Sequence, residues 1–151
     1  MSDQQVIDLL REAYVAEIET TMNYLAHSVN LDTFDGRDVG EELQADAQNE
    51  QDHALRLGNR LRVLGETALT SDEVAANITQ ESLNNISDTT DVLAVIDGVI
   101  EAEQSAIETY RNLVEVAREN GDYGTASLAE ELLQDEEQHL QEFKSLRRDF
   151  E

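Results

Sequence analysis

The chain contains the pattern Glu-x-x-His twice, at Glu50–His53 and at Glu136–His139. Each pattern lies 33 residues after another glutamate, Glu17 in the first half and Glu103 in the second. A Glu and a His three residues apart lie on the same face of a helix. Four carboxylates and two neutral imidazoles that meet inside a protein can hold two divalent metal ions with a nearly balanced charge.

Each of these six side chains interrupts a stripe of apolar residues at helical spacing. Glu17 lies between Ala13 and Tyr24, for example, and Glu103 lies between Ile100 and Ile107. A buried carboxylate is very costly unless it is paired or bound to a metal. Two of the three histidines in the chain belong to the pattern. We therefore predict a buried site for two metal ions, rather than glutamates on solvated helix faces.

Four helices are needed to position these ligands. Apolar residues recur at three- and four-residue steps over about 3–31, 38–64, 89–120 and 124–148. The segment 65–88 is long for a tight hairpin. It suits a crossover that makes the second and third helices point the same way.

The crossover carries its own structural signals. Thr70 and Glu73 have the spacing of a capping box, which predicts a short helix from near Ser71. A disordered linker is the alternative, but apolar residues such as Val74 favour an ordered segment. We expect one all-α domain over residues 1–151, an antiparallel four-helix bundle with a long crossover.

Some residues outside the pattern also receive predictions. Leu25 is assigned to the core-facing stripe of the first helix, and His27 to a surface or an interface. Asp46, Glu101 and Glu108 could guide or nucleate iron, but a solvated acidic face is the favoured interpretation.

The composition excludes several classes of protein. The 151 residues include no Cys, which rules out disulfides, thiolate metal sites and a Cys nucleophile. A net charge of −24 argues against binding to nucleic acid or to anionic lipid. No apolar run is long enough to span a membrane, and no signal peptide is visible, so we expect a cytoplasmic protein.

The acidic surface also indicates an environment. Lys144 is the single lysine, whereas 34 residues are Asp or Glu. Concentrated salt screens repulsion among crowded carboxylates. We therefore predict a halophilic source, with an acidic mesophilic protein as the alternative.

The complete pattern resembles that of the ferritin-like di-iron carboxylate proteins, most closely the bacterioferritins, over residues 3–148. The resemblance implies two terminal carboxylates, two bridging carboxylates and one imidazole per iron: Glu17 with Glu103, Glu50 with Glu136, and His53 with His139. Tyr24 is similar to the tyrosine near the di-iron centre of that family. An equal alternative is a core tyrosine that donates a hydrogen bond to a ligand.

This resemblance implies a ferroxidase that uses the six ligands and Tyr24. O₂ or H₂O₂ would take one electron from each iron, and the ferric product would be stored, which protects against oxidative damage. Manganese or zinc could replace iron, because the same ligand types suit all three metals. Bacterioferritins place a haem-ligating Met directly after the Glu of the helix-two motif. Gln51 stands at that position here, so haem is not expected.

The resemblance also implies a hollow homo-oligomeric shell. Cages of 24 subunits usually carry a fifth helix, whereas this sequence ends at Glu151, soon after the fourth. A crossover helix resembles the Dps architecture, and the combination resembles the Dps-like archaeal ferritins. A dodecamer is therefore favoured over a 24-mer or a dimer. The alternative functions are a rubrerythrin-like peroxidase, a manganese catalase, or a non-redox bundle that metal stabilises.

Overall fold

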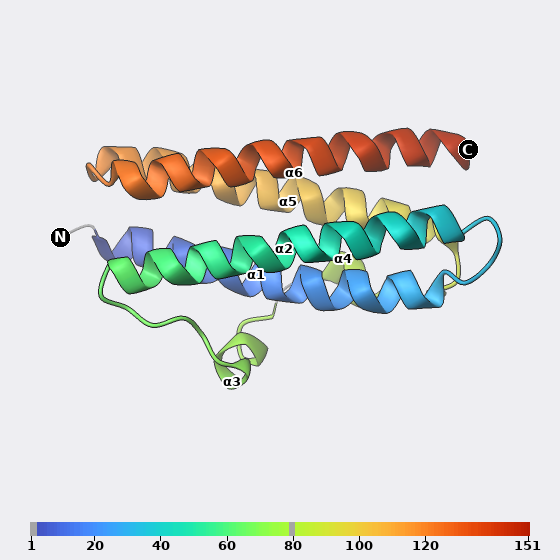
Figure 1. Ribbon diagram of the computed structural model, residues 1–151, viewed down its shortest axis with the longest axis horizontal. Helices are drawn as coiled ribbons and strands as arrows, with labels where there is room; N and C mark the ends of the chain where they lie inside the picture. The colour runs from blue at the N-terminus through green and yellow to red at the C-terminus, as the bar shows by residue number, and fades with distance from the viewer. Residues whose placement is uncertain (1–2, 79–80) are drawn as a thin grey trace.

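The computed structural model describes residues 3–78 and 81–151, which form six helices (Figure 1). The four long helices are α1 (Asp3–Asn30), α2 (Arg37–Val63), α5 (Val92–Glu119) and α6 (Tyr123–Asp149). Helix α1 packs against α2 and α5 packs against α6, and the two hairpins lie together as one bundle. The predicted all-α four-helix bundle is confirmed.

Glycines end two of the long helices. Gly65 follows α2 with φ of 88°, and Gly121 follows α5 with φ of 73°. The residue after each glycine turns its N–H back to the helix, with distances of 2.9 Å from Glu66 to the Leu61 carbonyl and 2.8 Å from Asp122 to the Ala117 carbonyl. This is the Schellman arrangement, in which a positive φ is needed and glycine adopts it without strain.

Helix α5 begins later than the sequence pattern predicted. We expected the start near Thr89 or Thr90, but the N-cap is Asp91, whose side chain accepts from the Ala94 N–H at 3.2 Å. Thr90 instead donates from both its N–H and its hydroxyl to Asp88. The local Asp–Thr turn satisfies these groups outside the helix, so the helix starts at Val92.

The crossover contains two short helices, α3 (Ser71–Ala75) and α4 (Glu81–Asn84). The Thr70 N–H donates to Glu73 Oε1 at 3.2 Å, so the predicted capping box and short helix are confirmed. Helix α4 was not predicted, because four residues are too few for a periodic pattern. The crossover makes α2 and α5 run in the same direction (Figure 1).

His27 secures the end of this crossover. Its side chain is buried, and Nε2 lies 2.9 Å from the Leu83 carbonyl oxygen, to which it donates. The prediction of a surface position for His27 was wrong. Leu25 was assigned to the core, but it is 48% exposed, and the neighbouring Tyr24 takes the inward position.

Two apolar clusters fill the bundle, one on each side of its middle. Large buried members of the first are Leu10, Leu57, Leu61, Leu113 and Leu132. Corresponding members of the second are Tyr24, Leu43, Val95, Val99 and Phe143. Every long helix contributes residues to both clusters. The middle turns of the four long helices therefore lie between the two clusters. No helix in the described ranges is long and apolar enough to cross a membrane.

Candidate metal centre

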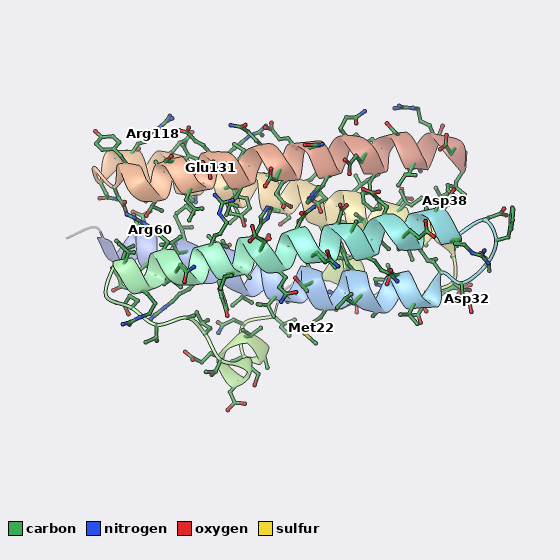
Figure 2. All side chains as sticks on the ribbon, viewed as in Figure 1. Met22, Asp32, Asp38, Arg60, Arg118 and Glu131 are labelled. Atoms are coloured by element: carbon green, nitrogen blue, oxygen red, sulfur yellow. The ribbon has the colours of Figure 1, made fainter. Side chains whose placement is uncertain are left out.

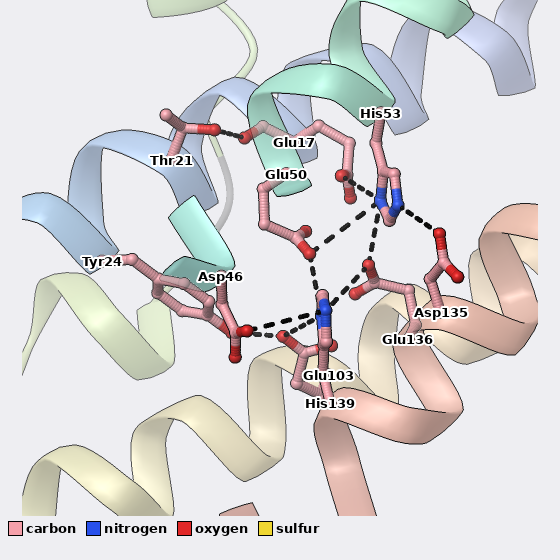
Figure 3. Close-up of polar contacts among 10 residues, drawn as sticks. All are labelled: Glu17, Thr21, Tyr24, Asp46, Glu50, His53, Glu103, Asp135, Glu136 and His139. Carbon is pink, nitrogen blue, oxygen red and sulfur yellow. Dashed lines mark hydrogen bonds and ion pairs between the residues drawn. The ribbon is translucent and has the colours of Figure 1, made fainter. Parts of the chain in front are cut away.

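The six side chains of the Glu/His pattern converge between the two apolar clusters (Figure 3). None is more than 5% exposed. Their ligand atoms form two groups, each with all atoms within 4.8 Å of one another. The groups are Glu17, Glu50, His53 and Glu136, and Glu50, Glu103, Glu136 and His139. Glu50 and Glu136 belong to both groups, so the arrangement offers two adjacent positions with two shared carboxylates.

Both imidazole rings turn Nδ1 into this cluster. His53 Nδ1 lies 3.0 Å from Glu17 Oε2 and 3.1 Å from Glu136 Oε1. His139 Nδ1 lies 3.0 Å from Glu50 Oε1 and 3.7 Å from Glu136 Oε1. The inward nitrogens therefore face the same carboxylate oxygens that would share a metal ion with them.

The outer ring nitrogens face two further carboxylates. His53 Nε2 lies 2.9 Å from Asp135 Oδ2, and His139 Nε2 lies 3.7 Å from Asp46 Oδ1. The hydrogen bond to Asp135 holds the His53 ring in place and leaves its Nδ1 free to bind a metal, whereas Asp46 lies beyond hydrogen-bond distance of His139. Asp135 was not predicted. The preference for a solvated face at Asp46 was wrong, because this residue is 3% exposed.

The two halves of the site differ in these outer carboxylates. The ligand pattern repeats after 86 residues, but the residue that corresponds to Asp135 is Asn49, and the one that corresponds to Asp46 is Leu132. The six candidate ligands therefore repeat between the two halves of the chain, whereas the carboxylates that face the outer histidine nitrogens do not.

Burial and mutual repulsion raise the pKa values of the four glutamates, so these side chains hold protons more tightly than exposed glutamates do. Burial raises the pKa of Glu17 and of Glu136 to about 7. Burial and neighbouring carboxylates hold the pKa values of Glu50 and Glu103 well above the ordinary range. These shifts mean that protons and cations compete for the same oxygens.

The pKa values of the two histidines are also raised, although burial acts on them in the opposite direction. Burial alone would lower the pKa of His53, but the nearby carboxylates of Glu136 and Glu17 outweigh burial and raise the pKa to about 12. Burial is outweighed in the same way at His139, where the nearby carboxylates of Glu50 and Glu103 raise the pKa to about 10. A divalent cation must therefore displace these protons, and binding it releases them.

The donor set fits a pair of metal ions. Among the described residues, both carboxylate oxygens of Glu50, Glu103 Oε2, Glu136 Oε1 and His139 Nδ1 are buried without a hydrogen-bond partner. Each such group costs about 1–3 kcal/mol when nothing satisfies it. Carboxylate and imidazole ligands together suit Fe(II), Mn(II) and Zn(II). Two divalent ions among four carboxylates would satisfy these atoms and balance the charge.

Two tyrosines border the Glu/His cluster, Tyr110 from the first apolar cluster and Tyr24 from the second. The Tyr24 hydroxyl donates to Glu103 Oε1, and its ring packs on Phe143 at a centroid distance of 6.5 Å. Burial, followed by the charge of Glu103, raises the Tyr24 pKa, so the hydroxyl stays a donor. Tyr110 lies 86 residues later, and within the described part of the chain its buried hydroxyl has no hydrogen-bond partner.

The amino-acid sequence matches a known protein family and is similar to a bacterioferritin. Residues 7–151 match the Ferritin family, described as a ferritin-like domain. A bacterioferritin from Desulfovibrio desulfuricans is 25% identical over 142 residues, which cover 94% of this chain and 74% of that protein.

Several solved structures share the fold. A ferritin-like diiron-carboxylate protein from Bacillus anthracis str. Ames has a TM-score of 0.83 at 19% identity, with 97% of this chain and 98% of that chain covered. The Desulfovibrio desulfuricans bacterioferritin, which has a diiron site, gives 0.83 at 23% identity, with 97% and 80% covered. Rhodobacter capsulatus bacterioferritin, described with a metal-free dinuclear site and a haem iron, gives 0.84 at 17% identity, with 97% and 86% covered. The family match, together with the buried Glu/His cluster, shows that this chain belongs to the ferritin-like di-iron carboxylate proteins and is a distant relative of the bacterioferritins.

Proposed function

We propose that this protein is a ferroxidase that binds two Fe(II) ions as substrate within each subunit and supports iron storage and detoxification. The observation that carries the proposal is the convergence of four buried glutamates and two inward-facing imidazoles at one level of the bundle. When bound, the two Fe(II) ions supply one electron each to O₂ or H₂O₂.

The six side chains form two neighbouring positions for metal ions. We assign Glu50 and Glu136 as the shared carboxylates because each lies in both ligand groups. The first position adds Glu17 and His53, and the second adds Glu103 and His139. Manganese and zinc would fit the same ligands.

Neighbouring groups keep this ligand set in place. The Tyr24 hydroxyl holds Glu103 Oε1, and Asp135 holds the outer nitrogen of His53. The apolar clusters on either side exclude water, which strengthens the attraction between carboxylates and cations. Gln51, on the exposed side of α2, offers no thioether ligand, so we propose a protein without haem.

We further propose that subunits assemble as a hollow homo-oligomer of twelve. Met22, Leu25 and Val29 recur on one side of α1 and are 64%, 48% and 70% exposed, and Figure 2 shows Met22 on the outside of the bundle. Contact between copies would bury such side chains. Light scattering should give twelve times the chain mass of 16.9 kDa.

The activity test is anaerobic addition of Fe(II) followed by O₂ or H₂O₂. The wild-type protein should consume about two Fe(II) ions per subunit in a fast phase. Glu103→Ala should lose that phase, whereas Glu108→Ala, at an exposed position on the same helix, should keep it. Absence of a fast phase in the wild type would contradict a ferroxidase. Rapid peroxide turnover without growth of a ferric mineral would indicate a peroxidase or a catalase instead.

A further inference from the structure

The loop between α1 and α2 presents an aromatic side chain to solvent. Among the described residues, Phe34 is the most exposed large apolar residue, at 88%. The loop itself is fixed, because the Gly36 N–H donates to the carbonyl and the hydroxyl of Thr33, both at 3.1 Å. Gly36 is buried, and a Cβ at this position would lie only 3.2 Å from Val92 Cγ2 at the start of α5. Aromatic side chains are enriched in protein interfaces, so a fixed and exposed Phe34 is a candidate contact residue.

Acidic residues surround this phenylalanine. Residues 32–38 contain Asp32, Asp35 and Asp38, against Arg37 as the one cation. Asp32 and Asp35 are exposed on either side of Phe34, and Figure 2 shows Asp32 at one end of the bundle. A surface that receives this loop should therefore offer an apolar floor for the ring and cations for the carboxylates.

A pocket between α5 and α6 offers both. Its volume is about 500 Å³, and its apolar lining comes from Ile107 and Leu140. Arg111 and Lys144 also line it, and both cations are exposed. A cation beside an aromatic ring adds its own attraction, so these two side chains suit the ring of Phe34 as well as the neighbouring aspartates. The pocket therefore complements the loop in both polarity and charge.

The two cations of the pocket are available to a further partner. Arg111 Nη2 lies 3.9 Å from Glu137 Oε2, which is a long and exposed ion pair. Within the described ranges, no carboxylate forms an ion pair with Lys144. Glu108 and Glu137 balance the two cations in the lining, although the chain as a whole carries a net charge of −24. An acidic loop therefore meets less repulsion at this pocket than over most of the surface.

The loop that fits this pocket must come from a second copy of the chain. Gly36 packs against Val92, and the pocket begins at Gln104, about 18 Å further along α5 at about 1.5 Å per residue. Phe34 is only two residues from Gly36, and two extended residues span at most about 7 Å. The loop therefore cannot reach the pocket of its own subunit.

We propose that Phe34 of one subunit inserts into the α5/α6 pocket of a second copy. The ring rests on Ile107 and Leu140, and the aspartates beside it face Arg111 and Lys144. The loop and the pocket are different surfaces, so the contact is head-to-tail and repeats from copy to copy until a closed assembly forms. The contact rests on the proposed homo-oligomer, but it requires neither twelve subunits nor ferroxidase activity.

Substitutions in the loop test the contact through the mass of the assembly, which mass photometry measures at one fixed KCl concentration. Phe34→Ser should weaken assembly at least about tenfold, whereas Phe34→Tyr should assemble like the wild type. Asp35→Asn should weaken assembly to a smaller extent. Glu41→Gln removes the same charge from an exposed position of α2 and should assemble like the wild type. Circular dichroism checks the helical content of each variant.

Charge reversal tests the pairing of the loop with the pocket. Lys144→Glu and Asp35→Lys should each weaken assembly, and the two combined should restore it, because the ion pair forms again with its charges exchanged. A loss of local structure at either position would not be repaired by the other substitution. Arg148→Glu makes the same change of charge as Lys144→Glu at another exposed position of α6 and should assemble like the wild type.

A cross-link identifies the two surfaces directly. Carbodiimide joins a carboxylate to an amine, and Lys144 is the single lysine, so cross-links form only at Lys144 or at the N-terminal amine. In assemblies that mix isotope-labelled and unlabelled chains, mass spectrometry should find Lys144 of one copy joined to Asp32 or Asp35 of another.

The outcomes separate this contact from the proposed shell. A wild type that stays monomeric overturns both. If the wild type assembles but Phe34→Ser and Lys144→Glu leave its mass unchanged, the contact is overturned and the homo-oligomer stands. The same conclusion follows if Lys144 is joined only to other carboxylates of the second copy. Loss of assembly in these two variants, together with rescue by charge reversal, supports the contact.

Discussion

The imidazole rings of His53 and His139 lie nearly parallel across the candidate centre, with an interplanar angle of 15° and centroids 6.3 Å apart. Each ring faces Glu136 with its inner nitrogen and a different acidic residue with its outer nitrogen. This relationship is consistent with two neighbouring ion positions rather than one. Under the proposed assignment, each position has its own imidazole.

Replacement of either imidazole should weaken one of the two ions. We expect His53→Ala and His139→Ala each to weaken the binding of one of the two metal ions by at least about ten- to a hundredfold. Each variant removes a side chain that would bind that ion directly. Anaerobic Co(II) titration followed by visible absorption measures both steps.

The third histidine provides the matched control. His27→Ala should bind both Co(II) ions normally, because this ring lies on the Leu83 carbonyl and not in the centre. It should lower the free energy of unfolding by about 1–3 kcal/mol, since the buried carbonyl loses its donor. Equal loss of Co(II) binding in all three variants would contradict the assignment of His53 and His139 as ligands.

The two buried tyrosines should respond differently to loss of the hydroxyl. In metal-free protein, Tyr24→Phe leaves Glu103 Oε1 without its donor and should cost about 1–3 kcal/mol in unfolding free energy. Tyr110→Phe removes a hydroxyl that has no hydrogen-bond partner among the described residues, and it should be neutral or stabilising. Urea denaturation measures both changes. Similar losses in the two variants would show that burial of the ring, and not the bond to Glu103, accounts for the effect at Tyr24.

The metal-free protein should become less stable as the pH rises. Burial raises the pKa of Glu17 and Glu136 from 4.5 to about 7, so the folded state binds these protons more tightly than the unfolded state does. Their contribution to stability is complete below about pH 4.5 and is lost as the pH rises through about 7. At His139, the neighbouring carboxylates outweigh burial and raise the pKa from 6.5 to about 10, which extends the loss to higher pH.

Bound cations should reverse this loss of stability with rising pH. Their positive charge takes the place of the protons that leave the glutamates. The rise in melting temperature caused by Mn(II) should therefore grow between about pH 4.5 and 7. Differential scanning calorimetry with and without Mn(II) measures it. The Glu50→Gln and Glu136→Gln double variant should show a much smaller increase. A Mn(II) effect that is constant over this range would contradict proton–metal competition in the centre.

The sequence predicted the side chains that meet in the centre because they interrupt apolar stripes. A carboxylate such as Glu103, placed between Ile100 and Ile107, can face only the core once the helix forms. Asp46 carried the same signal, since it precedes Glu50 by one helical turn on the same face. The abundance of acidic residues hid that signal, and Asp46 was assigned to solvent.

Other features have no local signal. Asp135 is half-exposed, and only the packing of α6 on α2 brings it to His53 Nε2. Leu25 and Tyr24 are adjacent and both apolar in character, so the periodicity alone did not determine which one faces the core. The start of α5 depended on competition between Asp88 and Asp91 for nearby N–H groups, which short-range patterns do not resolve.

Salt should stabilise this protein, if its acidic surface is an adaptation to concentrated salt. The chain has 34 acidic residues against ten basic ones, so most carboxylates have no cationic neighbour available. The Debye length falls from about 10 Å at 0.1 M salt to about 3 Å at 1 M, which removes most of the repulsion between surface charges. Metal-free protein should therefore melt at a temperature higher by more than about 2–4 °C in molar KCl than in dilute buffer, a shift that corresponds to about 1 kcal/mol in a domain of this size. The Glu101→Gln and Glu108→Gln double variant, with less charge to screen, should start from a higher melting temperature and gain less. Equal melting temperatures in dilute buffer and molar KCl would contradict the halophilic interpretation and leave an acidic mesophilic protein.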